Sequence, residues 1–297
     1  MKIEVRSAAK VNLTLDILSR RADGYHELAS VVHTIGIWDE IAVETQNGSE
    51  IAFGCNREDL SGSDNLCVRA AKMWQEAAGE NFGLQIHLEK RIPSGAGLGG
   101  GSGNAAAILL ALNRFANRPL DAPKLHEIGA KLGADVPLFL EGGAVLMEGI
   151  GEKLTPLAAL IGCVLVVKPA VSFATPAIFR RWDDGDLQSR RDTASLLEVW
   201  DGNLDQIAAR TGNDLVRAVA SFSEVPRQLV ALLRDCGALG AQMSGSGSAC
   251  FGIFGSDKEA QTASDALKSE LAKDVHLAST QRFVAPFCER GVEFLAP

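Results

Sequence analysis

The feature that most constrains this sequence is a glycine-rich stretch, residues 93–104, that runs directly into a strongly apolar segment, residues 105–115. Glycines have no Cβ atom to hold a ligand away from the backbone, and the free N–H groups at the start of a helix favour negative charge. The hydroxyls of Ser94 and Ser102 add hydrogen-bond donors, and Ser102 could reach a metal ion. The alternative is a bare turn, but the pattern favours a phosphate-binding loop over residues 94–103 that precedes a helix.

Better-known phosphate-binding designs do not fit this loop. Gly95, Gly97 and Gly100 match the G-x-G-x-x-G pattern of dinucleotide-binding proteins. In those proteins the glycines follow the first strand directly and an acid ends the next strand, whereas here residues 91–93 intervene and Asp121 lies in a polar, helix-starting segment. No lysine closes the glycine run as in a P-loop, and no H-R-D or D-F-G triplet of protein kinases occurs. A nicotinamide-dependent oxidoreductase is therefore the weaker hypothesis.

Charge and hydropathy argue against several classes of partner. Asp and Glu outnumber Lys and Arg by 37 to 29, and the resulting net charge of −8 argues against nucleic acid as the main partner. The longest uncharged apolar run, residues 158–167, has about half the length needed to cross a bilayer. The amino terminus lacks the layout of a secretory signal, and the six cysteines contain no C-x-x-C pair. We therefore expect a cytoplasmic protein that binds neither membrane nor nucleic acid.

The order of predicted elements indicates an α+β fold, and the 297 residues suffice for one large or two medium domains. The first helix has Ser63 or Asp64 as its predicted cap. Glycines, charges and a proline at residues 149–156 mark a boundary, which gives an N-terminal domain over 1–154 and a C-terminal domain over 155–297. Strands are predicted at residues 3–5, 11–17, 34–43, 84–88, 163–167 and 250–254, and helices within residues 65–78, 105–115, 121–132, 204–209 and 227–233.

Four side chains outside the glycine-rich loop could carry chemistry. Asp135 follows a predicted helix end, so it is either a local cap or a base that accepts a proton from an alcohol attacking phosphorus. Lys10 could be the cation that keeps this aspartate ionised, or a solvated lysine at a strand end. Tyr25, the single tyrosine, and His26 could bind a flat base, or could pack in an ordinary loop. The other histidines show no metal-ligand spacing, so the metal ligands are left unassigned.

In chain order, these motifs resemble those of the small-molecule kinase superfamily of galactokinase, homoserine kinase, mevalonate kinase and phosphomevalonate kinase. Within it, Arg-Ala-Asp-Gly-Tyr-His and the Gly-Gly-Gly-Ser loop are most similar to the 4-diphosphocytidyl-2-C-methyl-D-erythritol kinase family. The motifs that carry the resemblance span nearly the whole chain and comprise residues 7–13, 21–28, 93–106, 133–137 and 243–247.

The resemblance implies a fold, a reaction and partners. The fold would be the two-domain α+β fold of the GHMP-type kinases, with the active site in the cleft between an ATP-binding N-terminal domain and a substrate-side C-terminal domain. The reaction would be phosphorylation by ATP, with Mg²⁺, of the C2 hydroxyl of a cytidine diphosphate-linked methylerythritol in isoprenoid precursor biosynthesis. The partners would be this small molecule and, at most, a second copy of the chain, as a monomer or weak homodimer.

The resemblance also implies roles for single residues. Asp135 matches the base that takes the proton from the C2 hydroxyl, and Lys10 matches the lysine that holds this aspartate ionised. Tyr25 and Phe179 match the aromatics on either side of the cytosine, and His26 matches the residue that hydrogen-bonds its edge. The other positions matched to the substrate are Asn12, Thr175 and Arg180. The positions matched to ATP are Asn65, Lys90, Pro93, Ser94, Gly95, Ala96, Gly97, Leu98, Gly99, Gly100, Gly101, Ser102 and Gly103.

Two positions depart from the family pattern. Gly103 stands where many relatives carry serine or another small or polar residue, so Ser102 is expected to contribute more toward phosphate or metal. Arg180 stands where some relatives carry lysine, and its fork-shaped cation is expected to reach the substrate diphosphate differently. Two alternatives stay open: the same chemistry on homoserine, mevalonate or a sugar, and a nucleotide-binding module without catalysis.

Overall fold

A long strand, β3 (His26–Gln46), organises the larger of two sheets in the computed structural model, which describes residues 1–62, 64–116, 118–185, 187–200 and 203–296. The alternation that predicted a strand over 84–88 is confirmed, because Leu84, Ile86 and Leu88 are buried and the two residues between them are exposed. Four strands pair with β3 in antiparallel fashion: β1 (Lys2–Asn12), β2 (Thr14–Arg20), β5 (Gly83–Glu89) and β6 (Ala144–Gly149). The other strands of this sheet are β4 (Ile51–Cys55), β7 (Lys153–Leu157), β9 (Gly212–Asn213) and β13 (Val292–Phe294).

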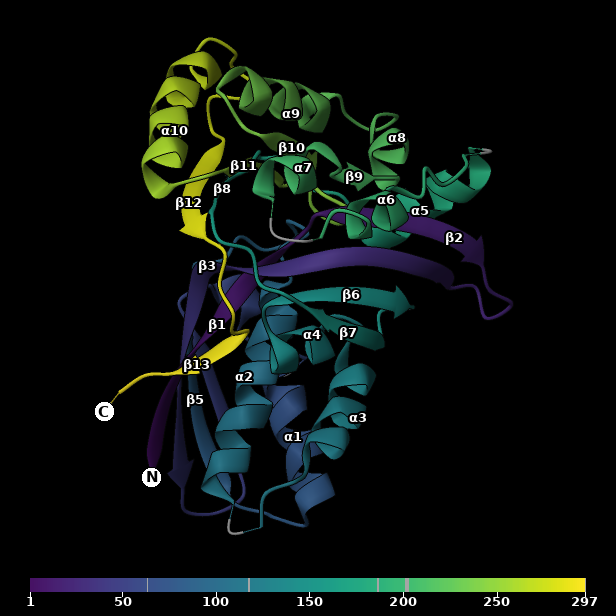
Figure 1. Ribbon diagram of the computed structural model, residues 1–297. Helices are drawn as coiled ribbons and strands as arrows, with labels where there is room; N and C mark the ends of the chain where they lie inside the picture. Colours follow the sequence, from purple (N-terminus) through teal and green to yellow (C-terminus); the bar gives the residue numbers. More distant parts are fainter. Residues whose placement is uncertain (63, 117, 186, 201–202, 297) are drawn as a thin grey trace.

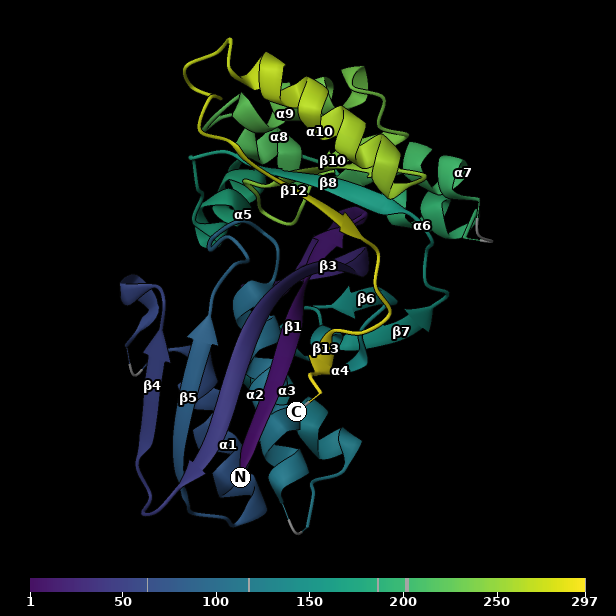
Figure 2. The ribbon, with the colours of Figure 1, turned by 90° about the vertical axis from the view of Figure 1, so that its left-hand side faces the viewer.

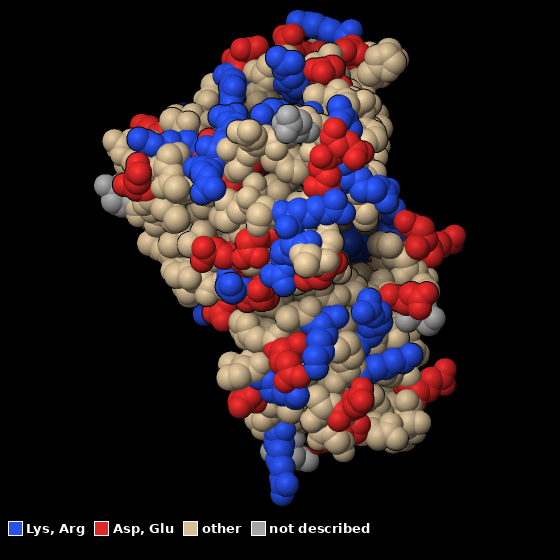
Figure 3. All heavy atoms as spheres, turned by 90° about the vertical axis from the view of Figure 1, so that its right-hand side faces the viewer, with Lys and Arg blue, Asp and Glu red and all other residues tan. Residues whose placement is uncertain are grey.

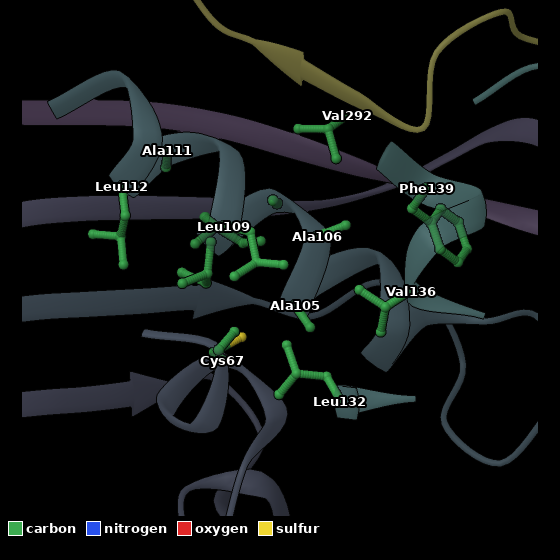
Figure 4. Packing of buried hydrophobic residues seen from close by; sticks show 14 of the residues in the cluster. Cys67, Ala105, Ala106, Leu109, Ala111, Leu112, Leu132, Val136, Phe139 and Val292 are labelled. Carbon is green, nitrogen blue, oxygen red and sulfur yellow. The ribbon is translucent and has the colours of Figure 1, made fainter. Parts of the chain in front are cut away.

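Helices cover one face of the larger sheet (Figures 1 and 2). The apolar helix after the glycine-rich loop lies at the centre of their core, where its alanines allow the neighbouring helices to approach closely. Figure 4 shows Ala105, Leu109 and Leu112 of this helix among side chains such as Cys67 and Phe139. The elements of this layer are η1 (Glu58–Leu60), α1 (Leu66–Ala78), α2 (Gly100–Phe115), α3 (Ala122–Leu132) and α4 (Val136–Glu141).

The second half of the chain builds a smaller antiparallel sheet with the strand order β10-β11-β8-β12. One face of this sheet packs on helices, and the other packs on the ends of β1 and β3, so that one apolar core joins the two parts of the molecule. The strands are β8 (Cys163–Lys168), β10 (Gly240–Met243), β11 (Cys250–Phe254) and β12 (Gln281–Pro286). The helices are α5 (Thr175–Asp184), α6 (Asp192–Leu197), α7 (Leu204–Ala209), α8 (Leu215–Val219), α9 (Val225–Asp235) and α10 (Asp257–Leu271).

The last strand returns to the first part of the molecule. After β12, the chain runs back so that β13 pairs with β1, with Val5 opposite Phe294 and Ser7 opposite Val292. Both ribbon views show this strand beside β1, away from the smaller sheet (Figures 1 and 2). The domain boundary at residue 154 stays a prediction.

Local structure differs from the sequence-based expectations at several places, among them the following three. Helix α2 begins at Gly100 instead of Ala105, because a glycine at 103 lets the first turn pack closely on β1: a Cβ there would lie 3.0 Å from the carbonyl oxygen of Ala8. Residues 136–141, which lie outside every predicted helix, form the short helix α4. The cap of α1 is Asn65, whose Oδ1 accepts from the Cys67 N–H at 2.9 Å. Of the two predicted caps, Ser63 lies outside the described residues, and Asp64 precedes the cap.

Candidate active site

Two adjoining cavities contain nearly all the residues that the sequence singled out. The large cavity, of about 530 Å³, is lined by both parts of the molecule, and the loop cavity, of about 390 Å³, is lined by residues between 60 and 104. Gly97 and Gly99 line both cavities. The face in Figure 3 is hollowed between the upper and lower parts, with basic side chains around the hollow.

Sequence-predicted residues divide between the two cavities according to their predicted roles. Of the predicted ATP residues, Gly103 is absent from the lining of the loop cavity, since its Cβ position faces Ala8 and Phe139. The large cavity is lined by Lys10, Asn12, Tyr25, His26, Asp135, Thr175, Phe179 and Arg180. The loop cavity is lined by Asn65, Lys90, Pro93, Ser94, Gly95, Ala96, Gly97, Leu98, Gly99, Gly100, Gly101 and Ser102.

Lys10 and Asp135 meet at the wall of the large cavity, although 125 positions separate them in the sequence. Lys10 Nζ lies 3.5 Å from Asp135 Oδ2, and the two side chains are 5% and 29% exposed. Asp135 occupies the N-cap position of α4 but makes no capping hydrogen bond, so its carboxylate is free to face the lysine. A buried ammonium without partners would be costly, and Lys10 offsets that cost by also donating to Asn12 Oδ1 at 2.6 Å.

A second loop of small residues, 243–247, forms hydrogen bonds with the backbone next to Lys10 and with the glycine-rich loop. The Ser244 hydroxyl accepts from the Asn12 N–H at 3.3 Å and donates to the Gly97 carbonyl oxygen at 2.8 Å. The amide of Asn12 donates in turn to Ser30 Oγ at 2.9 Å. The orientation of the Asn12 side chain is therefore fixed from both sides.

The glycines at 97 and 99 are required by close approaches. Both have left-handed backbone, with φ of 75° and 70°. A Cβ on Gly97 would overlap the Ser244 carbonyl oxygen, and one on Gly99 would lie 2.7 Å from Phe139 Cζ and 3.0 Å from Lys10 Cγ. Only residues without a side chain therefore let the loop lie this close to Lys10.

Asp39, which the sequence reading missed, fixes both ends of the glycine-rich loop. Its carboxylate is fully buried and accepts from the backbone N–H groups of Arg91 and Ile92 at 2.7 and 2.8 Å, just before the loop. It also accepts from Asn104 Nδ2 at 2.8 Å, just after the loop, and pairs with Lys90 Nζ. A signal for this role is an acid in the middle of an otherwise apolar strand segment, where burial demands partners.

Aromatic and basic side chains line another part of the large cavity. Tyr25 is 62% exposed, whereas His26 is 8% exposed and starts β3 instead of lying in a loop. The His26 ring lies 5.0 Å from the Phe179 ring, centroid to centroid. Thr175 shares a 2.7 Å hydrogen bond with Ser246, and Arg180 is exposed on α5. Asp183, another residue that the sequence reading missed, lies 2.7 Å from His26 Nε2.

The described residues contain no group of three or more His, Cys, Asp and Glu side chains placed to hold a metal ion. Across the same part of the chain, no helix combines the length and the apolarity that a membrane span requires.

Comparison with known proteins shows the family to which this fold belongs. The model of the GHMP kinases N terminal domain matches residues 65–143, and that of the GHMP kinases C terminal domain matches residues 202–273. A crystal structure of a homoserine kinase from Cytophaga hutchinsonii superimposes with a TM-score of 0.77 at 18% identity, covers 99% of this chain and 97% of its own, and shows the fold alone. The chain is an ATP-dependent small-molecule kinase with the GHMP fold, as predicted.

Closer relatives define a narrower group. A 4-diphosphocytidyl-2-C-methyl-D-erythritol kinase of Alkaliphilus metalliredigens is 39% identical over 94% of this chain and 97% of its own. A 4-diphosphocytidyl-2-C-methyl-D-erythritol kinase of Caldanaerobacter subterraneus is 38% identical over 86% of this chain and 88% of its own. A crystal structure of 4-(cytidine 5'-diphospho)-2C-methyl-D-erythritol kinase superimposes with a TM-score of 0.77 at 33% identity. The match covers 96% of this chain and 100% of the chain in that structure. The chain belongs to the 4-diphosphocytidyl-2-C-methyl-D-erythritol kinase family, which confirms the resemblance.

Proposed function

We propose that this chain transfers the γ-phosphoryl group of ATP to the C2 hydroxyl of 4-diphosphocytidyl-2-C-methyl-D-erythritol, a step of isoprenoid precursor biosynthesis. The names of the relatives supply the substrate. One observation carries the proposal: Lys10 and Asp135 meet in the large cavity, which adjoins the loop cavity at Gly97 and Gly99. An alcohol in one cavity and a triphosphate in the other would therefore meet beside the lysine and the carboxylate.

The loop cavity suits a triphosphate for two reasons. The loop carries glycines that leave its backbone accessible, and the first turn of α2 offers N–H groups at the positive end of the helix dipole. Ser102 makes no side-chain hydrogen bond within the described residues and would hold a Mg²⁺ ion carried by the phosphates, which would neutralise their charge. One hydroxyl, with no metal-holding group of acidic side chains among the described residues, fits an ion held mainly by the nucleotide.

The Lys10–Asp135 pair suits proton removal from the acceptor. Asp135 would take the proton as the C2 oxygen forms a bond to the γ-phosphorus, and the bond from that phosphorus to the bridging oxygen of ADP would break. Lys10 would donate a hydrogen bond to the same hydroxyl oxygen and offset the charge that develops there. Because Asn12 and Asp135 both bind its ammonium group, the lysine is held in place before the substrate arrives.

The rest of the large cavity suits a cytidine diphosphate group. Tyr25 and Phe179 offer aromatic faces, and His26 offers a ring nitrogen for a base edge. Arg180 and Thr175 lie on the same helix as Phe179, and an exposed guanidinium there can bind the diphosphate. Homoserine, mevalonate and simple sugars have no base for these aromatics, which disfavours the alternative acceptors.

One measurement of ADP release tests the proposal. Purified protein is given Mg-ATP with the diphosphocytidyl alcohol supplied or withheld, and in parallel with 2-C-methylerythritol, homoserine or mevalonate. ADP release is expected with the diphosphocytidyl alcohol alone. Equal release with another acceptor would overturn the choice of substrate. No release with any acceptor, from protein that still binds ATP, would overturn the proposed reaction.

A further inference from the structure

The contact between His26 and Asp183 determines what the histidine ring offers to a ligand. His26 Nε2 lies 2.7 Å from Asp183 Oδ1, and the two side chains are 7% and 19% exposed. A carboxylate accepts hydrogen bonds and cannot donate them, so Nε2 carries the proton of this bond. No residue in the described part of the chain hydrogen-bonds the other ring nitrogen, Nδ1. In a neutral imidazole whose proton is on Nε2, Nδ1 is an acceptor.

Helix α5 presents two groups to the same ring. Asp183 follows Phe179 by four positions, so both side chains lie on one face of the helix, and the Phe179 ring lies 5.0 Å from the His26 ring. The second carboxylate oxygen, Oδ2, lies 3.5 Å from Arg20 Nε. Asp183 is thus held between a cation and the histidine, and it fixes the His26 ring against Phe179 at the cavity wall.

We infer that Asp183 is a positioning residue that makes the site select cytosine over uracil, by holding the proton of His26 on Nε2. This inference rests on the proposed function, because it concerns the base of the substrate proposed above. Cytosine presents an amino group, N4–H₂, where uracil presents a carbonyl oxygen, O4. The Nδ1 acceptor receives a hydrogen bond from the amino group of cytosine. With uracil, the lone pair of Nδ1 faces a lone pair of O4, so no hydrogen bond forms. A polar group left unpaired at a partly buried site weakens binding.

Binding of two commercial nucleotides tests the selectivity. Calorimetric titration of the wild type is expected to show CDP bound about tenfold or more tightly than UDP, the factor that one well-made hydrogen bond provides. In Asp183→Leu, which has no acceptor for Nε2–H, the two Kd values are expected to converge. Asp183→Asn keeps an acceptor oxygen and is expected to restore the preference for CDP. The neighbouring acid is exposed and touches neither cavity, so Asp184→Asn is the matched control and should behave like the wild type.

A spectroscopic measurement reports the tautomer directly and applies even if Asp183→Leu folds poorly. In ¹⁵N-labelled wild-type protein at neutral pH, His26 is expected to show a protonated Nε2 and an unprotonated Nδ1, with the resonances assigned by their loss in His26→Asn. In Asp183→Asn the same tautomer is expected. A proton on Nδ1 in the wild type, whether alone or together with one on Nε2, would overturn the inference.

Steady-state kinetics separates positioning from a general structural role. Asp183→Leu is expected to raise KM for the diphosphocytidyl alcohol about tenfold while kcat and the KM for ATP stay unchanged. An unchanged ratio of CDP to UDP affinity in folded Asp183→Leu would refute the role of Asp183 and leave the proposed reaction standing. Absence of ADP release in the wild type with the diphosphocytidyl alcohol would refute the proposed function instead.

Discussion

The two cavities of this kinase are built in different ways. The loop cavity is lined by residues that lie between positions 60 and 104, and one buried carboxylate, Asp39, fixes both ends of its glycine-rich loop. The large cavity takes its lining from β1, from the start of β3, from the segment between α3 and α4, and from α5 and α8. A cavity made of one stretch depends on local backbone geometry, whereas a cavity made of several segments depends on how the whole chain folds.

Asp135→Asn is expected to have the largest effect, and to confine it to the large cavity. Loss of the base lowers kcat by about 10²–10⁴, while the Kd for ATP stays near the wild-type value because Asp135 does not line the loop cavity. Steady-state ADP release and calorimetric ATP titration measure the two quantities. The matched control is Asp121→Asn, at the N-cap of α3, because Asn caps a helix as well as Asp. Near-normal turnover of Asp135→Asn would contradict the assignment.

Gly97→Ala is expected to damage both cavities, since this residue lines each of them. The new Cβ must adopt left-handed backbone and would also overlap the Ser244 carbonyl oxygen, so a loss of about 3–4 kcal/mol in the free energy of unfolding is expected. The matched control is Gly95→Ala: Gly95 also has left-handed backbone, with φ of 62°, but the nearest atom to its Cβ position lies 3.9 Å away. Gly95→Ala is therefore expected to lose about 1–2 kcal/mol in urea denaturation. Equal losses would show that the Ser244 contact does not matter.

The difference between the cavities explains what the sequence could predict. The glycine-rich loop could be recognised because its glycines and the following apolar helix are contiguous, and the fold class followed from the order of strands and helices. The predicted start of α2 was wrong because the low helix propensity of glycine argued against a helix at residues 100–103. Close packing of Gly103 on Ala8 favours a helix there.

The large cavity was much harder to predict from the residues alone. The residues around Asp135 in the sequence fit a helix cap as well as a base, and those around Lys10 fit a solvated lysine as well as a buried one. Only the tertiary structure shows that the Lys10 and Asp135 side chains lie 3.5 Å apart. The roles proposed for these two residues come from the resemblance to known kinases. Asp39 and Asp183 were missed because their partners, Arg91 and His26 among them, lie far away in the sequence.

A buried histidine makes the free energy of unfolding depend on pH between about 4 and 6.5. His33 of β3 accepts from the Leu160 N–H at 3.0 Å, and burial lowers its pKa from 6.5 to about 4. The unfolded chain therefore binds a proton below about pH 6.5, whereas the folded chain does so only below about pH 4. This contribution is fully present above pH 6.5, and about 3 kcal/mol is lost as the pH falls to about 4.

Urea denaturation at several pH values measures this loss. In His33→Gln, the part of the pH dependence that belongs to His33 should disappear, so the slope of unfolding free energy against pH becomes flatter between pH 6.5 and 4. His276 is exposed, and His276→Gln is expected to keep the wild-type slope. An identical slope in wild type and His33→Gln would refute the assignment.

The smallest expected effect concerns the exposed rim of the large cavity. Tyr25→Ala removes one stacking face, which raises KM for the diphosphocytidyl alcohol about tenfold and leaves kcat and the KM for ATP unchanged. Tyr25→Phe keeps the face and is expected to match the wild type. Phe222 is similarly exposed, at 52%, but lines neither cavity, so Phe222→Ala serves as the control. An equal change in KM for ATP would show that the two cavities are not separable at this residue.

The pairing of β13 with β1 has a consequence for the order of events during synthesis. β1 precedes β13 by about 280 residues along the chain, so the edge of β1 that binds β13 stays uncovered until residues 292–294 have been synthesised. Exposed strand edges invite pairing with other chains. A nascent chain stalled before residue 292 therefore exposes the edge of β1, the strand that bears Lys10, and this edge is covered only when β13 pairs with it.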